Sequence, residues 1–146
     1  MVLVDRVISI DPGRSIVAMK AITVGELCFR HLARDEPAQR YIYPTSLLLE
    51  SFGQAAALLW LSSMPPAALE DGALLMLAAA RDCEIEGSAL PGDTLRHVAQ
   101  IDHVVGNNVF VSGATYVEAR RVAHIGSMTA VMRSHPQLGR SLPPGP

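Results

Sequence analysis

The sequence predicts an α+β domain in which a curved antiparallel sheet wraps around one long central helix. One run, residues 45–61, is apolar, made of good helix-forming residues and too long for a strand. The other regular segments are rich in Val and Ile and are separated by short turn sequences. An apolar helix needs cover around most of its circumference, and a curved sheet provides that cover.

The N-terminal part predicts a β-hairpin that leads into a loop. Segments 2–10 and 15–23 are rich in Val and Ile, and the DPGR sequence between them has turn chemistry at each position. Residues 24–43 carry charges and little periodicity, as is typical of a loop. The helix should follow, with Thr45 or Ser46 as its N-cap, and should end before the MPP sequence at 64–66.

The C-terminal half predicts several strands. A hairpin, a loop, one buried helix and then strands is the order of a hot-dog fold, and the free edge of such a sheet could be extended by a dimer. We expect a buried strand over 74–80, a turn at 91–93, and long strands over 94–105, 109–119 and 122–133, joined by a tight loop at 106–108 and a turn at 118–121.

Composition indicates a single packed domain. The chain has 146 residues, of which 49% are hydrophobic and 18% charged, so it can bury one core. We expect this domain to cover residues 1–133 and to be followed by a disordered, proline-rich tail over 134–146. The formal net charge of -2 leaves no broad basic surface, so nucleic acid is not an expected partner.

The sequence favours the cytoplasm. The opening MVLVDRV has a charge at its fifth residue, so we expect no secretory signal. Cys28 and Cys83 form no C-x-x-C pair, which suits free thiols in a reducing compartment. The longest apolar stretch, 47–61, is interrupted by Glu50 and Gln54 and is shorter than the ~20 residues that a membrane span needs.

The predicted helix carries a carboxylate, Glu50. It shares a face with Ser46 and Gln54, because the three residues are spaced four apart. A carboxylate in so apolar a run is costly to bury, so it must find a partner, reach water or serve in chemistry. Two interpretations stay open: Glu50 is catalytic, or it lies at the exposed edge of the helix or ties down a loop.

The five histidines do not predict a metal site. His97 and His103 fall on the same face of one predicted strand, roughly 20 Å apart, which is too far to share a metal ion. His31 lies just before the loop that leads to the helix, where a lone histidine is usually a solvated side chain. The sequence has no G-x-S-x-G, G-x-G-x-x-G or P-loop motif, so we expect neither a nucleotide cofactor nor a metal.

Three stretches of the sequence resemble a known family. They are LVDRVISIDPGRSIVAMKAIT near the start, YIYPTSLLLESFGQAA at the helix and ARDCEIEGSALPGDTL before the long strands. In this order they resemble the FabZ/FabA-type 3-hydroxyacyl-[acyl-carrier-protein] dehydratases. The resemblance runs from about Leu3 to Met132, and it implies a hot-dog fold, a dimer with its sites at the subunit interface, and no cofactor or metal.

The resemblance also implies a catalytic His before the helix and a catalytic carboxylate on it, which match His31 and Glu50. We assign His31 as the base that takes the α-proton of a 3-hydroxyacyl thioester, and Glu50 as the acid that protonates the departing hydroxyl. The backbone N–H of Thr45, at the helix N-terminus, is expected to stabilise the enolate oxygen. Ser46 and Gln54 are expected to bind substrate.

The sequence departs from the family around His31. Arg30 stands where the family has Gly, the LAR sequence at 32–34 replaces Phe-Pro-Gly, and Thr45 replaces another Gly. We expect Asp35 or Glu36 to pair with Arg30 and to hold His31 in place.

Alternatives remain open for the activity and the partner. The chain could be a hot-dog thioesterase, or one half of a heterodimeric polyketide dehydratase that has lost part of its own site. The acyl thioester could be carried by acyl carrier protein or by coenzyme A, and the active form could be a homodimer. Phe52 and Leu49 could line an acyl channel or belong to the core.

Overall fold

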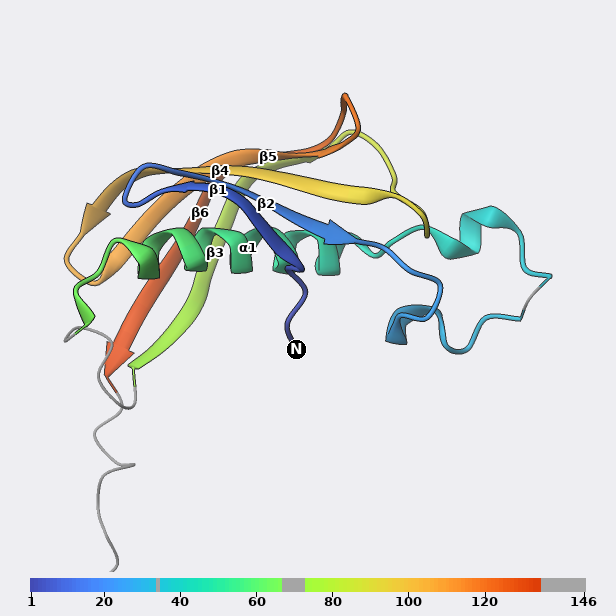
Figure 1. Cartoon of the computed structure of the whole chain (residues 1–146), viewed down its shortest axis with the longest axis horizontal. Coiled ribbons are helices and arrows are strands. Elements are labelled where there is room, and N and C mark those ends of the chain that lie inside the picture. Colours follow the sequence, from blue (N-terminus) through green and yellow to red (C-terminus); the bar gives the residue numbers. More distant parts are fainter. Residues whose placement is uncertain (34, 67–72, 135–146) are drawn as a thin grey trace, which may run out of the picture.

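The computed structural model describes residues 1–33, 35–66 and 73–134, and this part of the chain packs one long helix against one antiparallel sheet (Figure 1). The sheet has 6 strands in the order β1-β2-β4-β5-β6-β3. The predicted α+β arrangement is therefore confirmed. The helix is α1 (Thr45–Ser62), and the strands are β1 (Arg6–Asp11), β2 (Ser15–Ala21), β3 (Ala73–Ile85), β4 (Thr94–Val105), β5 (Asn108–Val117) and β6 (Arg120–Ser134).

The N-terminal hairpin and the loop after it are confirmed. β1 and β2 pair in antiparallel fashion, and β2 then pairs with β4. The loop contains two short 3-10 helices, η1 (Leu27–Phe29) and η2 (Ala38–Tyr41). It extends past the N-terminal end of α1, away from the strands (Figure 1).

The start of α1 differs from the prediction in its cap. Pro44 is the N-cap residue, and no side chain caps the helix, so the prediction of Thr45 or Ser46 as N-cap is wrong. Proline fixes its own φ near the value needed at a helix start, and the Pro44 carbonyl accepts from Leu48 N at 3.1 Å. Thr45 is therefore already the first helical residue. The C-terminal end at Ser62 lies before 64–66, as predicted.

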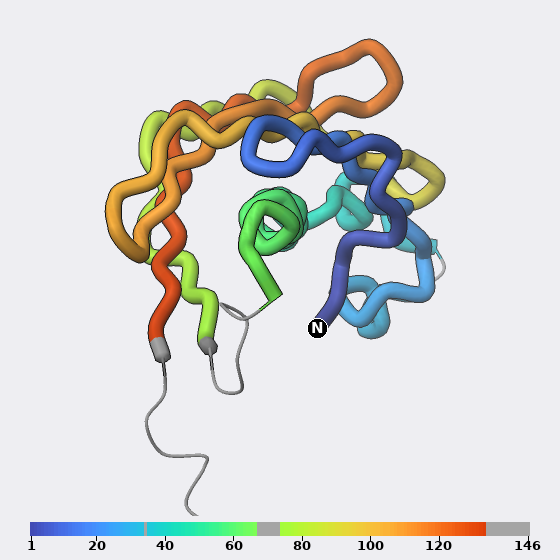
Figure 2. The backbone as a smooth tube through the Cα atoms, turned by 60° about the vertical axis from the view of Figure 1, so that its left-hand side comes forward, coloured from blue at the N-terminus to red at the C-terminus, as the bar shows by residue number. Residues whose placement is uncertain are grey.

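One side of α1 fills the concave face of the sheet, as Figure 2 shows with the helix seen nearly end-on. The opposite side is open in the single chain, where Glu50 is exposed and Leu58 keeps 40% of its surface accessible. The sequence predicted cover around most of the helix circumference, but in the single chain one side of α1 stays exposed. The buried residues of α1 are Leu48, Ser51, Phe52, Ala55, Ala56, Leu59 and Trp60.

The strand after the helix was predicted to be buried, and this prediction is wrong. Within the part of the chain that the structure describes, β3 is an edge strand that pairs only with β6, and Leu74, Met76 and Leu77 are 46–50% exposed. An apolar run indicates that a strand needs burial but not which surface buries it. The strands β2, β4, β5 and β6 agree with their predicted bounds to within two residues, whereas β1 begins four residues later than predicted. The turn at Gly106 has two residues, Gly106 and Asn107, and the left-handed φ of 57° at Gly106 suits the tight hairpin.

His97 and His103 do not share a face, contrary to the expectation from alternation. His97 is buried and His103 is exposed. A bulge between Ile101 and His103 shifts the register with β5 and breaks the alternation of side chains. The predicted tail lies outside the described residues from 135 onward, although Ser134 still pairs with Ala73 at the end of β6. In the described part of the chain, no helix has the length and apolar character to cross a membrane.

Three fully buried polar side chains lie between α1 and the sheet, and we call them the Ser51–His97–Thr115 network. The Ser51 hydroxyl is 2.9 Å from Nε2 of His97, and Nδ1 of His97 is 2.9 Å from the Thr115 hydroxyl. Burial disfavours the imidazolium and lowers the pKa of His97 to about 4 from its ordinary 6.5. The native protein therefore holds this histidine neutral.

The pKa of His97 predicts acid sensitivity. Between pH 6.5 and about 4 the unfolded chain protonates this histidine and the native chain does not. The free energy of unfolding should therefore fall as the pH falls through this window, by up to ~1.4 kcal/mol per pH unit. Above pH 6.5, His97 should add nothing to the pH dependence of the free energy of unfolding. Urea unfolding at several pH values measures the slope. His97→Leu should flatten the slope while His103→Leu, at the exposed histidine, should keep it; equal slopes in both variants would contradict the assignment.

Candidate active site

An apolar cavity of about 170 Å³ lies between one flank of α1 and the strands β3, β5 and β6, and we call it the helix–sheet cavity. Among the described residues, Glu50 is the one charged residue in its lining, and Gln54 is the one other polar side chain. The lining residues are Glu50, Gly53, Gln54, Ala56 and Ala57 of α1, Leu75 and Leu77 of β3, Val109 and Val111 of β5, and Met128 and Ala130 of β6.

Small residues on α1 create this space. Gly53, Ala56 and Ala57 lie three and four positions apart and so share one face of the helix. A Cβ atom added at Gly53 would contact the sulfur of Met128 at 3.4 Å, so even one carbon reaches the opposite wall. Because no large side chain on this face fills the space between α1 and β6, an apolar cavity remains there that could take an apolar ligand.

Gln54 holds Glu50 and the N-terminal segment together. Its Nε2 donates to Oε1 of Glu50 at 3.1 Å and to the Met1 carbonyl at 2.9 Å. Its Oε1 accepts from the backbone N–H of Leu3 at 2.7 Å. The amide that was expected to bind substrate is thus occupied by the chain itself in this structure. Its position shows an orienting contact with the Glu50 carboxylate at the mouth of the cavity.

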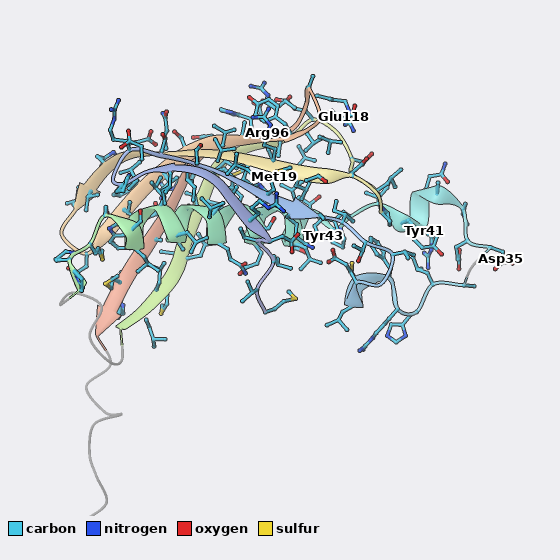
Figure 3. All side chains as sticks on the ribbon, viewed as in Figure 1. Met19, Asp35, Tyr41, Tyr43, Arg96 and Glu118 are labelled. Atoms are coloured by element: carbon cyan, nitrogen blue, oxygen red, sulfur yellow. The ribbon has the colours of Figure 1, made fainter. Side chains whose placement is uncertain are left out.

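The root of the loop that carries His31 is anchored by a largely buried ion pair. Lys20 Nζ lies 2.6 Å from Oε1 of Glu26, and the two side chains keep only 8% and 13% of their surface exposed. The ring of Phe29, which is buried, contacts the rings of Tyr41 and Tyr43 at centroid distances of 5.8 and 6.4 Å. Figure 3 shows Tyr43 near the start of α1 and Asp35 at the outer end of the loop.

His31 is exposed on this loop and bonds to its neighbour. Nε–H of Arg30 donates to Nε2 of His31 at 2.8 Å, so this nitrogen acts as the acceptor. The expected pairing of Arg30 with Asp35 or Glu36 is wrong for this structure, because Glu36 pairs with Arg40 at 3.7 Å. Arg30 and His31 are adjacent, so their contact costs less chain entropy than a contact between Arg30 and an acid five or six residues away.

The structure does not bring His31 and Glu50 together within one chain. His31 does not line the helix–sheet cavity, and no hydrogen bond joins the two residues in the described part of the chain. Thr45 and Ser46 are exposed at the first turn of α1, where backbone N–H groups have no partner within the helix. Neither residue lines the cavity.

Several lining residues were missed by the sequence analysis. Phe52 is fully buried in the core and Leu49 packs against it, so neither lines the cavity, and the suggestion that they form an acyl channel is not supported. The stripe of small residues on the helix was the available signal. The contributions of β3, β5 and β6 depend on pairing across the sheet, which the sequence does not reveal.

Comparison with known proteins identifies the family of this chain. A model of the FabA-like domain matches residues 1–125. The chain is 35% identical over 124 residues to the 3-hydroxyacyl-[acyl-carrier-protein] dehydratase FabZ of Anaeromyxobacter sp. (strain K), covering 83% of this chain and 74% of that one. It is 35% identical over 95 residues to the FabZ of Pseudoalteromonas translucida (strain TAC 125), and there the alignment spans 65% of this chain and 59% of the relative.

A solved structure shares the fold. The dehydratase heterocomplex ApeI:P from Xenorhabdus doucetiae superposes with a TM-score of 0.71 at 15% identity, covering 91% of this chain and 84% of that one. The packing of one long helix against an antiparallel sheet and the match over residues 1–125 indicate the same fold and family. This chain has the hot-dog fold and belongs to the FabA-like family.

Proposed function

We propose that this protein dehydrates a 3-hydroxyacyl thioester to the 2-enoyl thioester, in fatty-acid or polyketide synthesis. The observation that carries the proposal is Glu50, the one carboxylate among the described residues that line a cavity whose walls are apolar apart from Glu50 and Gln54. Family membership supports it, since the relatives are named as dehydratases that act on acyl carrier protein substrates. In this proposal the acyl thioester is carried by acyl carrier protein. The alternative carrier is coenzyme A, and assays with both kinds of thioester distinguish the two.

The reaction needs two proton transfers. The lone pair of His31 Nε2 takes the α-proton, and the Glu50 carboxyl gives a proton to the C3 hydroxyl, which leaves as water. The thioester is conserved, and the enolate oxygen accepts from the backbone N–H groups near Thr45, where the helix dipole favours negative charge. Ser46 lies beside this position, and Gln54 keeps the Glu50 carboxylate in place through its 3.1 Å hydrogen bond.

The site requires a second subunit. His31 and Glu50 do not meet within one chain, and the wall of the cavity at Leu75 and Leu77 belongs to the edge strand β3. The exposed apolar residues of β3 and its unpaired backbone groups suit pairing with another strand. A second copy, or a related hot-dog subunit, would cover this edge and present its own His31 to Glu50. The free thiols of Cys28 and Cys83 suit a reducing compartment, so we place the reaction in the cytoplasm.

The function is tested by incubating the purified protein with 3-hydroxyacyl thioesters of several lengths on carrier protein and on coenzyme A. Dehydration removes one water and keeps the thioester, so mass should fall without release of a free thiol. Release of the thiol would instead identify a thioesterase. No reaction by the chain alone, followed by dehydration after a related subunit is added, would identify a heterodimer.

Glu50→Gln should lower turnover by about 10²–10⁴-fold, because Gln keeps the shape but cannot supply the proton. Glu118→Gln, at the exposed turn between β5 and β6, is the matched control and should keep full activity. Steady-state kinetics measures the loss, and circular dichroism checks the fold. Turnover of Glu50→Gln within a few-fold of wild type would exclude the assigned role.

Sites shared between subunits predict complementation. When His31→Ala and Glu50→Gln chains are unfolded and refolded together, about half of the dimers are mixed, and each mixed dimer has one intact site. Roughly a quarter of wild-type activity should therefore return from two inactive variants. If both residues of a site came from one chain, every site would carry a lesion and no activity would return. Refolded wild type sets the yield.

Filling the helix–sheet cavity should change the accepted chain length. Gly53→Leu places a side chain where one carbon already touches Met128, so long acyl chains should lose kcat/KM more than the shortest substrate. The control is Leu58→Ala, on the exposed side of α1 and outside the cavity lining. The measurement is kcat/KM across a chain-length series. An equal loss for every length would show that the acyl chain does not enter this cavity.

A further inference from the structure

The Ser51–His97–Thr115 network connects the helix of the proposed site to the middle of the sheet. Ser51 lies on α1, His97 on β4 and Thr115 on β5, and each of the three keeps 0% of its surface exposed. The two hydrogen bonds to the imidazole both measure 2.9 Å. None of the three residues lines the helix–sheet cavity. The network therefore cannot serve as a nucleophile and base, because no substrate reaches it.

The direction of the hydrogen bonds follows from counting protons. The hydroxyl of Ser51 donates to the carbonyl of Leu48 at 2.9 Å, and a hydroxyl has one proton to give. His97 must then donate to Ser51 through Nε2–H, and its Nδ1 must accept from the hydroxyl of Thr115. This assignment satisfies both nitrogens of a neutral ring. It agrees with the lowered pKa that burial gives His97.

Apolar contacts alone would not fix the rotation of α1 so narrowly. Burial of apolar surface is non-directional, whereas a hydrogen bond weakens steeply when its angle changes. His97 also presents its ring edge-on to Phe52, with centroids 6.0 Å apart and an angle of 82°. Gly113 of β5 lets the sheet approach here, because a Cβ would meet the Val98 carbonyl and lie 3.1 Å from the Phe52 ring. The helix is held at Ser51 and Phe52 by geometry as well as by burial.

Glu50 immediately precedes these two residues on α1. Successive residues of an α-helix are separated by about 100°, so Ser51 facing the sheet leaves Glu50 facing the cavity. A small rotation of the helix would swing the carboxylate away from the mouth of the cavity. We propose that Ser51, His97 and Thr115 are positioning residues that set the rotation of α1 on the sheet and thereby aim the Glu50 carboxylate. This inference rests on the proposed role of Glu50 in dehydration.

The test separates positioning from stability. The triple variant Ser51→Ala, His97→Leu, Thr115→Val replaces every member of the network with an apolar side chain of similar size, so no buried polar group is left without a partner. It should fold with nearly unchanged stability. Its kcat should nevertheless fall by about 10- to 100-fold at similar KM, because a displacement near 1 Å at a catalytic group is costly.

Two control variants accompany it. Thr115→Ser keeps the hydroxyl and should keep kcat within about twofold of wild type. Ile16→Val removes one carbon from a buried residue of β2 outside the network and the cavity, and should lower stability without lowering kcat. A triple variant that folds and retains wild-type kcat would overturn the proposal. So would a loss in Ile16→Val as large as that in the triple variant.

A structural measurement tests the positioning role independently of the proposed dehydratase activity. Crystal structures of wild type and the triple variant are superposed on β4 and β5, and the position of the Glu50 carboxylate is compared. A shift of about 1 Å or more is expected, and coincident positions would overturn the proposal whether or not the wild type is active. If the triple variant does not fold, Thr115→Val alone, which removes one hydroxyl at constant shape, takes its place in both arms. Nitrogen-15 shifts of His97 should show the proton on Nε2, and a proton on Nδ1 would contradict the network as described.

Discussion

Packing of α1 into the concave face of the sheet is the interaction on which the rest of this structure depends. The sheet has no other element to cover its inner face in the described part of the chain, and α1 has no other surface on which to bury Phe52, Leu59 and Trp60. Each of these side chains contributes on the order of 1.5–3 kcal/mol when fully buried. This energy holds the two layers together but leaves the rotation of the helix loosely specified. Directional contacts at one turn of the helix, at Ser51 and Phe52, supply the missing information.

The two sides of this helix are built differently, as suits the proposal that one of them presents catalytic groups. The inner side buries large apolar side chains against the sheet. The cavity side carries Gly53, Ala56 and Ala57, which are too small to fill the space toward β6 and so leave an apolar cavity lined by Glu50. Space next to a packed core lowers stability, because contacts are lost around it. The free edge at β3 is a second liability for a chain that remains alone, because the backbone groups of an unpaired apolar edge strand can pair with other chains.

Much of the fold followed from the sequence because it is encoded locally. The bounds of β4, the end of α1 and the turns at 106–107 and 118–119 follow from periodicity, proline and turn chemistry within a few residues. Glu50 could also be predicted from the sequence, because a carboxylate within an apolar run is visible within a few residues of sequence. Strand order decides that β3 is an exposed edge and which strands form the walls of the cavity. A bulge in β4 decides that His97 and His103 lie on opposite faces. These are non-local properties, and no window of the sequence contains them.

The contact between Arg30 and His31 shows how a departure from the family pattern can be accommodated. A glycine before the histidine would leave Nε2 open, whereas here a guanidinium N–H occupies that lone pair at 2.8 Å. Both side chains are exposed, so water competes for the same groups and the contact is weak enough to be exchanged readily. In the proposed mechanism, abstraction of a proton by His31 requires Arg30 to turn toward another acceptor. The anchoring of the loop at Lys20–Glu26 and Phe29 makes this a motion of one side chain, because the backbone that carries His31 is already fixed at its root. Under that proposal, Arg30 alters access to Nε2 of His31 without altering where the loop presents this side chain.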